Sequence, residues 1–221
     1  MANINYDYID RFLLGMIPEQ SGILKEMEEY AKENNVPIIT PDIARLLTVL
    51  IKSANVRTIL EIGTAIGYSA VHVCLCAGEG CAITTIERNE ESAGIASDFI
   101  KKAGMEDRIK IVTGDAEVIL NDIPGSFDMI FVDAAKGQYM DFMKKSIDKL
   151  RIGGLFVCDN VLFRGMVADR SLLIRRKITI VKRLKKFLSF ISSCESLATA
   201  IIPMGDGISI SCKLKEVEFN E

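Results

Sequence analysis

Three side chains with hard oxygen donors follow two apolar segments that have the composition of buried strands. Asp133 comes directly after 127–132, and Asp159 with Asn160 comes directly after 154–158. If these segments are neighbouring parallel strands, their carboxyl ends bring the two carboxylates and the amide together at one edge of a sheet. Such a set, completed by water and substrate oxygens, suits an octahedral Mg²⁺ ion better than zinc. The alternative is that the acidic residues independently cap two strands.

Lys136 lies three residues beyond Asp133, on the segment that leads into the next expected helix. A lysine beside a cation-bound hydroxyl could accept the hydroxyl proton, provided that the cation and desolvation lower the lysine pKa toward neutrality. The sequence therefore offers Lys136 as a general base next to the cation site. A solvated loop lysine is the alternative.

The stretch from Glu61 to Ser69 contains two glycines and follows the apolar run 58–60. It predicts a buried strand that breaks into a turn and then a helix, which leaves backbone N–H groups and a cavity for a nucleotide-type ligand. Gly63 and Gly67 have the spacing Gly-x-x-x-Gly, which argues against the Gly-x-Gly-x-x-Gly turn of dinucleotide sites. The acidic Glu61 at the start of the turn favours a cationic ligand.

Two further acidic residues follow the next two expected strands. Glu87 lies some twenty residues beyond the glycine turn, where a carboxylate can accept both hydroxyls of a ribose. Asp115 follows the third strand in the same way and could accept from an adenine amino group. The alternatives are an ordinary charged residue at a strand end for Glu87 and a helix N-cap for Asp115.

Regular alternation of strands and helices positions these residues. The first part of the chain predicts helices at 5–16, 19–34 and 41–54. The pattern that follows predicts a parallel sheet covered on both faces, with strands at 57–62, 82–87, 109–113, 127–132 and 154–158, and helices at 67–77, 89–103, 116–121 and 138–149. A long helix at 170–193 precedes two short runs, 197–202 and 207–212. The Pro/Gly/Asp turn between these runs predicts that the sheet ends in an antiparallel strand.

These segments together resemble the metal-dependent class I O-methyltransferases that include catechol and caffeoyl-CoA methyltransferases. The segments that carry the resemblance are 61–69, Glu87, 114–116, 131–136 and 159–162. The resemblance covers nearly the whole chain and implies one domain, 1–221, with a helical N-terminal cap over 1–55 and a Rossmann-like core over 56–221. Its α/β fold would have a seven-stranded, mostly parallel sheet with one antiparallel strand, helices on both faces and the extra N-terminal helices.

The resemblance also implies roles for single residues. The donor is S-adenosylmethionine, bound by Ile39, Glu61, Gly63, Ala65, Tyr68, Ser69, Glu87, Asp115, Ala116 and Asp133. Asp133, Asp159 and Asn160 match the ligands of Mg²⁺ or another divalent cation, and Lys136 with Asp133 matches the catalytic pair. Ile39 departs from the family pattern, because relatives often carry methionine there. The chemistry agrees, since acidic groups attract a sulfonium, and methyl transfer needs a deprotonated oxygen held in line.

Within this family, 159–168, the following basic stretch and 197–211 look most like the bacterial branch that methylates 5-hydroxyuridine at the tRNA wobble position. The expected product is 5-methoxyuridine, and tRNA would be the partner. The cations expected to contact RNA are Arg164, Arg170, Arg175, Arg176, Lys182, Arg183 and Lys186. At about 100° per residue, those in the predicted helix 170–193 share one face, although Lys177 lies on the apolar side. A solvated charged face or a membrane-surface helix is the alternative.

Composition narrows the remaining possibilities. The 221 residues are 49% hydrophobic with a net charge of −3, which suits one domain with a sizeable core. An apolar run of about eighteen residues and a signal-peptide pattern are both lacking, which predicts a cytoplasmic protein without a membrane partner. The six cysteines lack metal-site or Cys-x-x-Cys spacing and read as core residues, as does the single His72. Family resemblance further suggests a homodimer.

Two other functions remain open at this level. The first is a catechol- or caffeoyl-CoA-type methyltransferase of small molecules, which would use the same site and which an aromatic-rich acceptor pocket would favour. The second is a cofactor-binding protein without catalysis. The presence of all three predicted metal ligands and Lys136 argues against this second function, because cofactor binding alone requires neither metal nor base.

Overall fold

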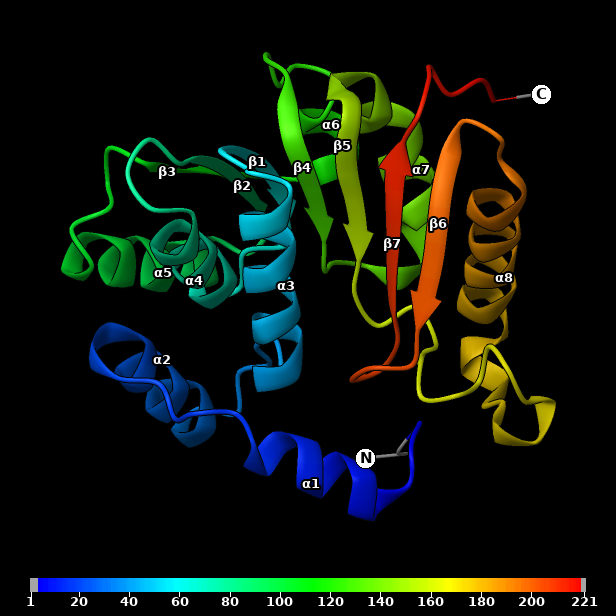
Figure 1. Ribbon diagram of the computed structural model, residues 1–221, viewed down its shortest axis with the longest axis horizontal. Coiled ribbons are helices and arrows are strands. Elements are labelled where there is room, and N and C mark those ends of the chain that lie inside the picture. The colour runs from blue at the N-terminus through cyan, green and yellow to red at the C-terminus, as the bar shows by residue number, and fades with distance from the viewer. Residues whose placement is uncertain (1–3, 220–221) are drawn as a thin grey trace.

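The computed structural model describes residues 4–219, and within them a seven-stranded sheet forms the centre of the protein (Figure 1). The strand order is β3-β2-β1-β4-β5-β7-β6, and all neighbours are parallel except the two pairs that include β7. The strands are β1 (Thr58–Ile62), β2 (Ala82–Glu87), β3 (Ile109–Thr113), β4 (Phe127–Val132), β5 (Leu150–Cys158), β6 (Leu197–Ile202) and β7 (Ile208–Lys213). This arrangement confirms the predicted Rossmann-like α/β fold with one antiparallel strand.

The antiparallel strand does not end the sheet, contrary to the expectation from the sequence. β7 lies between β5 and β6, and β6 forms the edge. The burial of the two strands explains this order. β7 buries four of its six residues, whereas most of β6 is exposed or half-buried. The better-buried strand therefore occupies the inner position, where both of its edges are paired, although β6 has the more apolar sequence.

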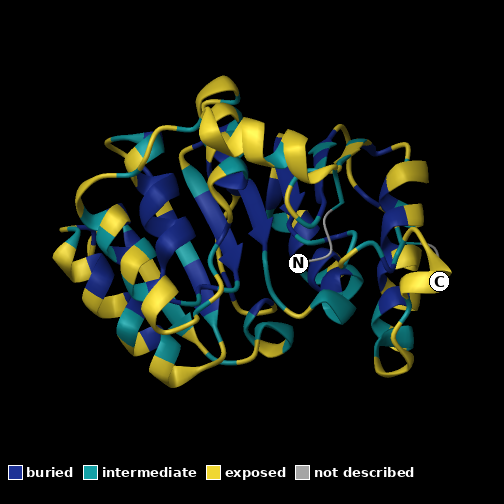
Figure 2. Cartoon of the chain, turned by 90° about the horizontal axis from the view of Figure 1, so that it is seen from below, coloured by how far each residue is buried: buried dark blue, intermediate teal, exposed yellow. Residues whose placement is uncertain are grey.

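Helices cover both faces of the sheet, and side-chain alternation along β4 shows the two layers. Met129 and Phe131 pack into one hydrophobic cluster with α3, α4 and α5, while Ile130 and Val132 pack into another with α7 and α8. In Figure 2 the buried residues gather in the strands and on the inner sides of the helices. The helices involved are α2 (Gly22–Glu33), α3 (Pro41–Ser53), α4 (Tyr68–Ala77), α5 (Glu90–Lys102), α6 (Ala116–Ile119), α7 (Tyr139–Ser146) and α8 (Ile178–Ser193).

The long helix predicted over 170–193 begins only at Ile178, so its first eight residues were predicted wrongly. They form two single 3-10 turns, η3 (Arg170–Leu172) and η4 (Arg175–Lys177), separated by extended backbone at Leu173 and Ile174. The Asp169 side chain caps the first turn by accepting from the Ser171 N–H. Ile174 is 46% exposed and does not continue the buried stripe of α8. Without an apolar surface to cover, this segment gains little from being helical.

The first helix, α1 (Asp7–Gly15), contributes no buried residue, yet it lies at the edge of the sheet where the parallel strands end (Figure 1). By contrast, α2 and α3 place Met27 and Leu47 in the same cluster as β1 and α4. The apolar stripe on each of these two helices accounts for this packing. Among the helices of residues 4–219, none has the length and apolar character that crossing a membrane requires.

Candidate active site

The carboxyl ends of three adjacent strands are aligned by hydrogen bonds that continue the sheet by one residue. In each case the first residue after a strand donates its N–H to the last carbonyl of the neighbouring strand or, in β2, to the last but one. These bonds join Gly63 to Ile86 (3.0 Å), Asp133 to Ile62 (2.9 Å) and Asp159 to Val132 (3.0 Å). The sheet itself therefore brings the glycine turn and both predicted acidic residues to one edge.

The glycine turn after β1 approaches the neighbouring strand end closely. A Cβ atom on Gly63 would lie 2.2 Å from the carbonyl oxygen of Asp133, and the residue has a positive φ of 102°. Only glycine combines this backbone conformation with such a contact. Gly67, at φ 83°, is the N-cap of α4. The turn consequently passes directly against the backbone at the end of β4.

Glu87 closes the other side of the glycine turn. Its carboxylate accepts the N–H groups of Thr64 (3.2 Å) and Ala65 (2.9 Å), and its second oxygen accepts from Asn89 (2.8 Å). The sequence predicted that N–H groups of this turn face a ligand, but Glu87 already binds two of them. Glu87 therefore stabilises the conformation of the turn through these hydrogen bonds.

Glu61, the one acidic residue of β1, is buried beneath this turn, with 2% of its surface exposed. The hydroxyls of Ser69 and Thr85 each donate a hydrogen bond to its carboxylate, with an oxygen–oxygen distance of 2.5 Å. Burial raises the pKa of Glu61 to about 7, the negative charges of Asp133 and Glu87 act in the same direction, and the two hydrogen bonds oppose them. A cation that binds close by would favour the charged form of this carboxyl group.

Asp133 and Asp159 make up the acidic part of the site. The Lys136 ammonium donates to the Asp133 carboxylate at 2.8 Å. Asp159 is 3% exposed, and burial followed by the charge of Asp133 raises its pKa to about 7. The Asn160 N–H donates to the Asp159 carboxylate at 2.6 Å.

These residues fit a divalent cation. A cation would relieve the repulsion that the two nearby carboxylates otherwise experience. Within residues 4–219, no cluster of three or more His, Cys, Asp or Glu side chains is arranged to hold a metal. The predicted third ligand, Asn160, supplies an amide oxygen instead of a carboxylate. Oxygen donors of this kind match a hard cation such as Mg²⁺.

A cavity of about 1230 Å³ joins most of the predicted site residues. Its wall includes Ile39, Gly63, Ala65, Tyr68, Ser69, Asp133, Lys136, Asp159, Asn160 and Arg164. Apolar side chains of α1 and α3, including Leu13 and Leu46, line the same space. The predicted cation ligands and six of the ten residues predicted to bind the donor therefore share one cavity, and α1 forms part of its wall.

Four residues predicted to bind the donor lie outside the cavity wall. Glu61 is buried beneath the glycine turn, and Glu87, Asp115 and Ala116 lie at the ends of β2 and β3, further along the carboxyl edge. Asp115 caps α6 by accepting the Glu117 N–H at 2.9 Å, which is the alternative that the sequence left open. Their placement at the same edge is compatible with a ligand that extends from the cavity over β2 and β3.

The predicted cations of the basic stretch are all exposed, but they do not share one helix face. Arg164 lines the cavity, and Arg175 and Arg176 belong to the 3-10 turn before α8. Arg183 of α8 donates to the Gly137 carbonyl at 3.3 Å, one residue beyond Lys136. The exposed cations are Arg164, Arg170, Arg175, Arg176, Lys182, Arg183 and Lys186. We call these seven exposed residues, which run along the sequence from the cavity wall to α8, the basic surface.

Sequence reasoning missed three polar residues of the site. Thr85 is paired with Glu61 in the β1–β2 register and binds its carboxylate. Tyr139 of α7 donates its hydroxyl to the Asp159 carbonyl at 2.7 Å. Asp206, in the β6–β7 turn, lines the cavity and accepts the Arg164 N–H. A polar residue inside an otherwise buried strand was the available signal for Thr85; Asp206 was read only as part of a turn.

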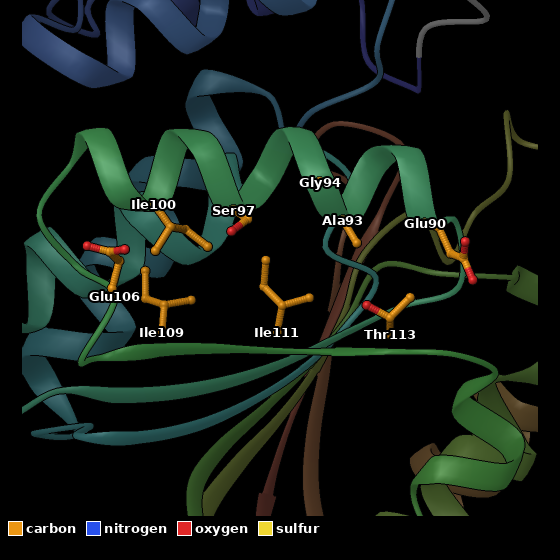
Figure 3. A pocket seen from close by; sticks show the side chains of 9 residues that line it. All are labelled: Glu90, Ala93, Gly94, Ser97, Ile100, Glu106, Ile109, Ile111 and Thr113. Atoms are coloured by element: carbon orange, nitrogen blue, oxygen red, sulfur yellow. The ribbon is translucent and has the colours of Figure 1, made fainter.

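A second hollow, of about 620 Å³, lies between α5 and the edge strand β3. Figure 3 shows Ile100 and Ser97 of α5 facing Ile109 and Ile111 of β3, with glutamates toward both ends. Small side chains on α5 leave this space open. It contains none of the predicted site residues.

Comparison with known proteins identifies the family. The O-methyltransferase family model matches residues 16–214. Caffeoyl-CoA O-methyltransferase of Medicago sativa is 30% identical over 95% of this chain and 88% of its own length. A Staphylococcus aureus protein assigned as a caffeoyl-CoA O-methyltransferase superposes with a TM-score of 0.87 at 32% identity, covering 94% of this chain and all of that one.

A third relative connects the fold with the donor. The structure of an O-methyltransferase from Bacillus cereus, in complex with S-adenosylhomocysteine, has a TM-score of 0.80 at 25% identity and covers 93% of this chain and 97% of that one. S-adenosylhomocysteine is the product that remains when S-adenosylmethionine gives up its methyl group. The chain belongs to the O-methyltransferase family and is a class I S-adenosylmethionine-dependent O-methyltransferase.

Proposed function

We propose that this protein is a Mg²⁺-dependent O-methyltransferase that converts 5-hydroxyuridine at the tRNA wobble position to 5-methoxyuridine. The observation that carries the proposal is the position of Arg164. This residue lines the same cavity as Asp133 and Lys136, and it also belongs to the exposed basic surface. A nucleotide whose base enters the cavity would leave its phosphates near these cations. Phosphate contacts of this kind supply most of the affinity in sequence-independent RNA and DNA binding.

The cavity residues have separate tasks in this reaction. Asp133, Asp159 and Asn160 would hold the divalent cation, which lowers the pKa of the acceptor hydroxyl. Lys136, 2.8 Å from Asp133, would take up the hydroxyl proton in its neutral form. Glu61 beneath the glycine turn provides negative charge for the sulfonium side of the donor. The apolar wall excludes water and leaves the acceptor oxygen to be held in line with the methyl group.

The test of the substrate compares the nucleosides of tRNA from cells with and without the gene. We expect 5-methoxyuridine to disappear and 5-hydroxyuridine to accumulate in the deletion strain. Purified protein with S-adenosylmethionine and Mg²⁺ should then methylate tRNA from that strain. Unchanged 5-methoxyuridine together with no methyl transfer in vitro would contradict the proposal.

The test of the basic surface replaces four of its cations, Arg175, Arg176, Lys182 and Arg183, by alanine. Loss of four phosphate contacts should weaken tRNA binding and reduce the slope of log Kd against log salt by up to roughly 3. Binding of S-adenosylmethionine should not change. The control replaces four exposed lysines elsewhere, namely Lys25, Lys32, Lys101 and Lys110. If both variants bind tRNA like the wild type, RNA docks on another surface.

A small catechol or a caffeoyl-CoA-type acceptor is a second candidate. It is favoured by the relatives named as caffeoyl-CoA O-methyltransferases and by the apolar side chains of α1 and α3 in the cavity wall. The same purified protein should be offered caffeoyl-CoA and a simple catechol beside the hypomodified tRNA. The acceptor with the highest kcat/KM identifies the substrate class.

We also propose that the protein is a homodimer. The support is α1 with its N-cap and C-cap residues, which expose six large apolar side chains between 41% and 71%: Tyr6, Tyr8, Phe12, Leu13, Leu14 and Met16. Apolar surface of this kind commonly marks an interface between subunits. Sedimentation equilibrium should give twice the chain mass of 24.4 kDa, and a monomer at micromolar concentration would contradict this proposal.

A further inference from the structure

The segment that follows β5 is held by a turn more than forty residues away. We call residues 159–165 the acceptor loop, because it carries Asp159, Asn160 and Arg164 into the cavity wall. Its backbone is bonded to the β6–β7 turn, residues 203–207. The bonds run from the Val161 N–H to the Gly207 carbonyl (2.9 Å), from the Leu162 N–H to the Asp206 carbonyl (3.0 Å) and from the Arg164 N–H to the Asp206 carboxylate.

The turn and the loop are also in close van der Waals contact. A Cβ atom on Gly207, which has a φ of 83°, would lie 2.3 Å from Cγ of Leu162. Leu162 can therefore pack directly on the turn backbone only because residue 207 is glycine. The contact fixes the distance between the acceptor loop and Asp206.

The acceptor loop requires external support because its backbone is unfavourable. Asn160, Phe163 and Arg164 all have positive φ values, of 55°, 48° and 57°. Residues other than glycine adopt this region only when the surrounding structure holds them there. Among the side chains of residues 4–219, that of Asp206 is the one that accepts the Arg164 backbone N–H. The Asp206 carboxylate thus holds Arg164 in its strained conformation, and Arg164 is part of the cavity wall.

We infer that Asp206 is a positioning residue for methyl transfer, which acts through the Arg164 backbone to hold the acceptor loop in the geometry that the acceptor requires. Its carboxylate is engaged by a backbone N–H, so it does not need to touch the reacting atoms. The inference rests on the O-methyltransferase activity and not on tRNA being the acceptor. It predicts that loss of Asp206 impairs the use of the acceptor. Binding of S-adenosylmethionine should change little, because the glycine turn of the donor site follows β1.

Two substitutions of Asp206 separate hydrogen bonding from charge. Asp206→Asn keeps a side-chain oxygen that can accept the Arg164 N–H, and Asp206→Ala removes it. Asp169→Ala is the matched control, because Asp169 caps Ser171 on the same segment without contacting the β6–β7 turn. Gly207→Ala is a further variant that displaces the turn from Leu162 but leaves Asp206 intact.

Amide hydrogen exchange at Arg164 reports on the contact directly. In Asp206→Ala and Gly207→Ala we expect exchange at Arg164 to accelerate by roughly tenfold to a hundredfold, whereas Asp206→Asn and Asp169→Ala should stay close to the wild type. This measurement uses no substrate. Its result is therefore independent of whether the tRNA proposal holds.

Steady-state kinetics test the effect on the reaction. Hypomodified tRNA and caffeoyl-CoA are both offered to the wild type, and the compound that it methylates is used as the acceptor for the variants. In Asp206→Ala, acceptor KM should rise about tenfold or kcat fall to a similar extent, while the Kd of S-adenosylmethionine changes by less than about twofold. Asp206→Asn should restore most of the activity. The inference is overturned if Arg164 exchange is unchanged in both Asp206→Ala and Gly207→Ala, if acceptor kinetics survive Asp206→Ala, or if Asp206→Asn is as impaired as Asp206→Ala.

Discussion

The Tyr139 hydroxyl donates a hydrogen bond to the backbone carbonyl of Asp159, with an oxygen–oxygen distance of 2.7 Å. Tyr139 begins α7, is 1% exposed and packs edge-on against Phe187 of α8, with ring centroids 5.8 Å apart. The bond thus connects the helical layer on one face of the sheet to the residue that follows β5. Through it, packing of α7 and α8 helps to hold Asp159 at the cavity.

Replacement of Tyr139 by Phe should reveal this connection. The ring still fills its place, but the Asp159 carbonyl loses a partner in a buried region, which should lower the free energy of unfolding by about 1–2 kcal/mol. Activity should fall more than stability suggests, because Asp159 is less firmly held. Urea denaturation and initial rates at saturating Mg²⁺ measure both effects. The control is Tyr8→Phe, since Tyr8 is 63% exposed, and equal effects of both substitutions would contradict this role.

Gly63→Ala should be far more damaging than an ordinary glycine replacement. The added methyl group would meet the Asp133 carbonyl at 2.2 Å, and alanine is strained at a φ of 102°. We expect a loss of at least about 1–3 kcal/mol in stability, with binding of S-adenosylmethionine reduced as the turn moves. Calorimetric Tm and titration of the donor measure the two losses. Gly94→Ala, at a helical glycine with no atom within 4 Å of the added Cβ, should leave donor binding unchanged and should not lower Tm, because alanine favours the helix over glycine.

Site residues that directly follow a strand could be predicted from the sequence, whereas residues that depend on contacts between distant segments could not. Strand ends followed by Gly63, Asp133 and Asp159 could be read from the chain, because parallel strands direct their carboxyl ends to one edge. The role of Tyr139 could not be read from the chain, since an aromatic residue at the start of an amphipathic helix looks like any core residue. Asp206 could not either, because its partner Arg164 lies 42 positions away and meets it only through the β6–β7 turn.

The boundary of α8 shows a second limit of sequence reasoning. The alternation of cations and apolar residues continued through 170–177 and predicted one helix. In the structure, Leu173 and Ile174 are extended, and Lys177 lies over the Phe163 ring at 5.7 Å from its centroid. Tertiary contacts of this segment with the acceptor loop replaced the helical conformation that periodicity favoured. Arg170, Arg175 and Arg176 therefore lie on 3-10 turns and not on the predicted helix.

Removal of the divalent cation should abolish methyl transfer if Asp133, Asp159 and Asn160 hold it. EDTA should inactivate the enzyme and Mg²⁺ should restore it. Asp133→Ala and Asp159→Ala should each reduce kcat by more than roughly 100-fold, because even outer-shell partners of a metal contribute 10- to 100-fold. Asp169→Ala, an exposed acidic residue outside the cavity, is the control. Activity that survives both EDTA and Asp159→Ala would refute the metal role.

The buried Glu61 should make the stability of the ligand-free protein depend on pH. Burial raises its pKa from 4.5 to about 7, so the folded protein keeps a proton that the unfolded chain releases. Its contribution is therefore fully present below pH 4.5 and is lost as pH rises to about 7, at up to about 1.4 kcal/mol per pH unit. Glu61→Gln cannot titrate, so the difference in unfolding free energy between the two proteins should change over this interval and level off above it. Parallel stability curves from pH 4.5 to 8 would show that Glu61 titrates normally.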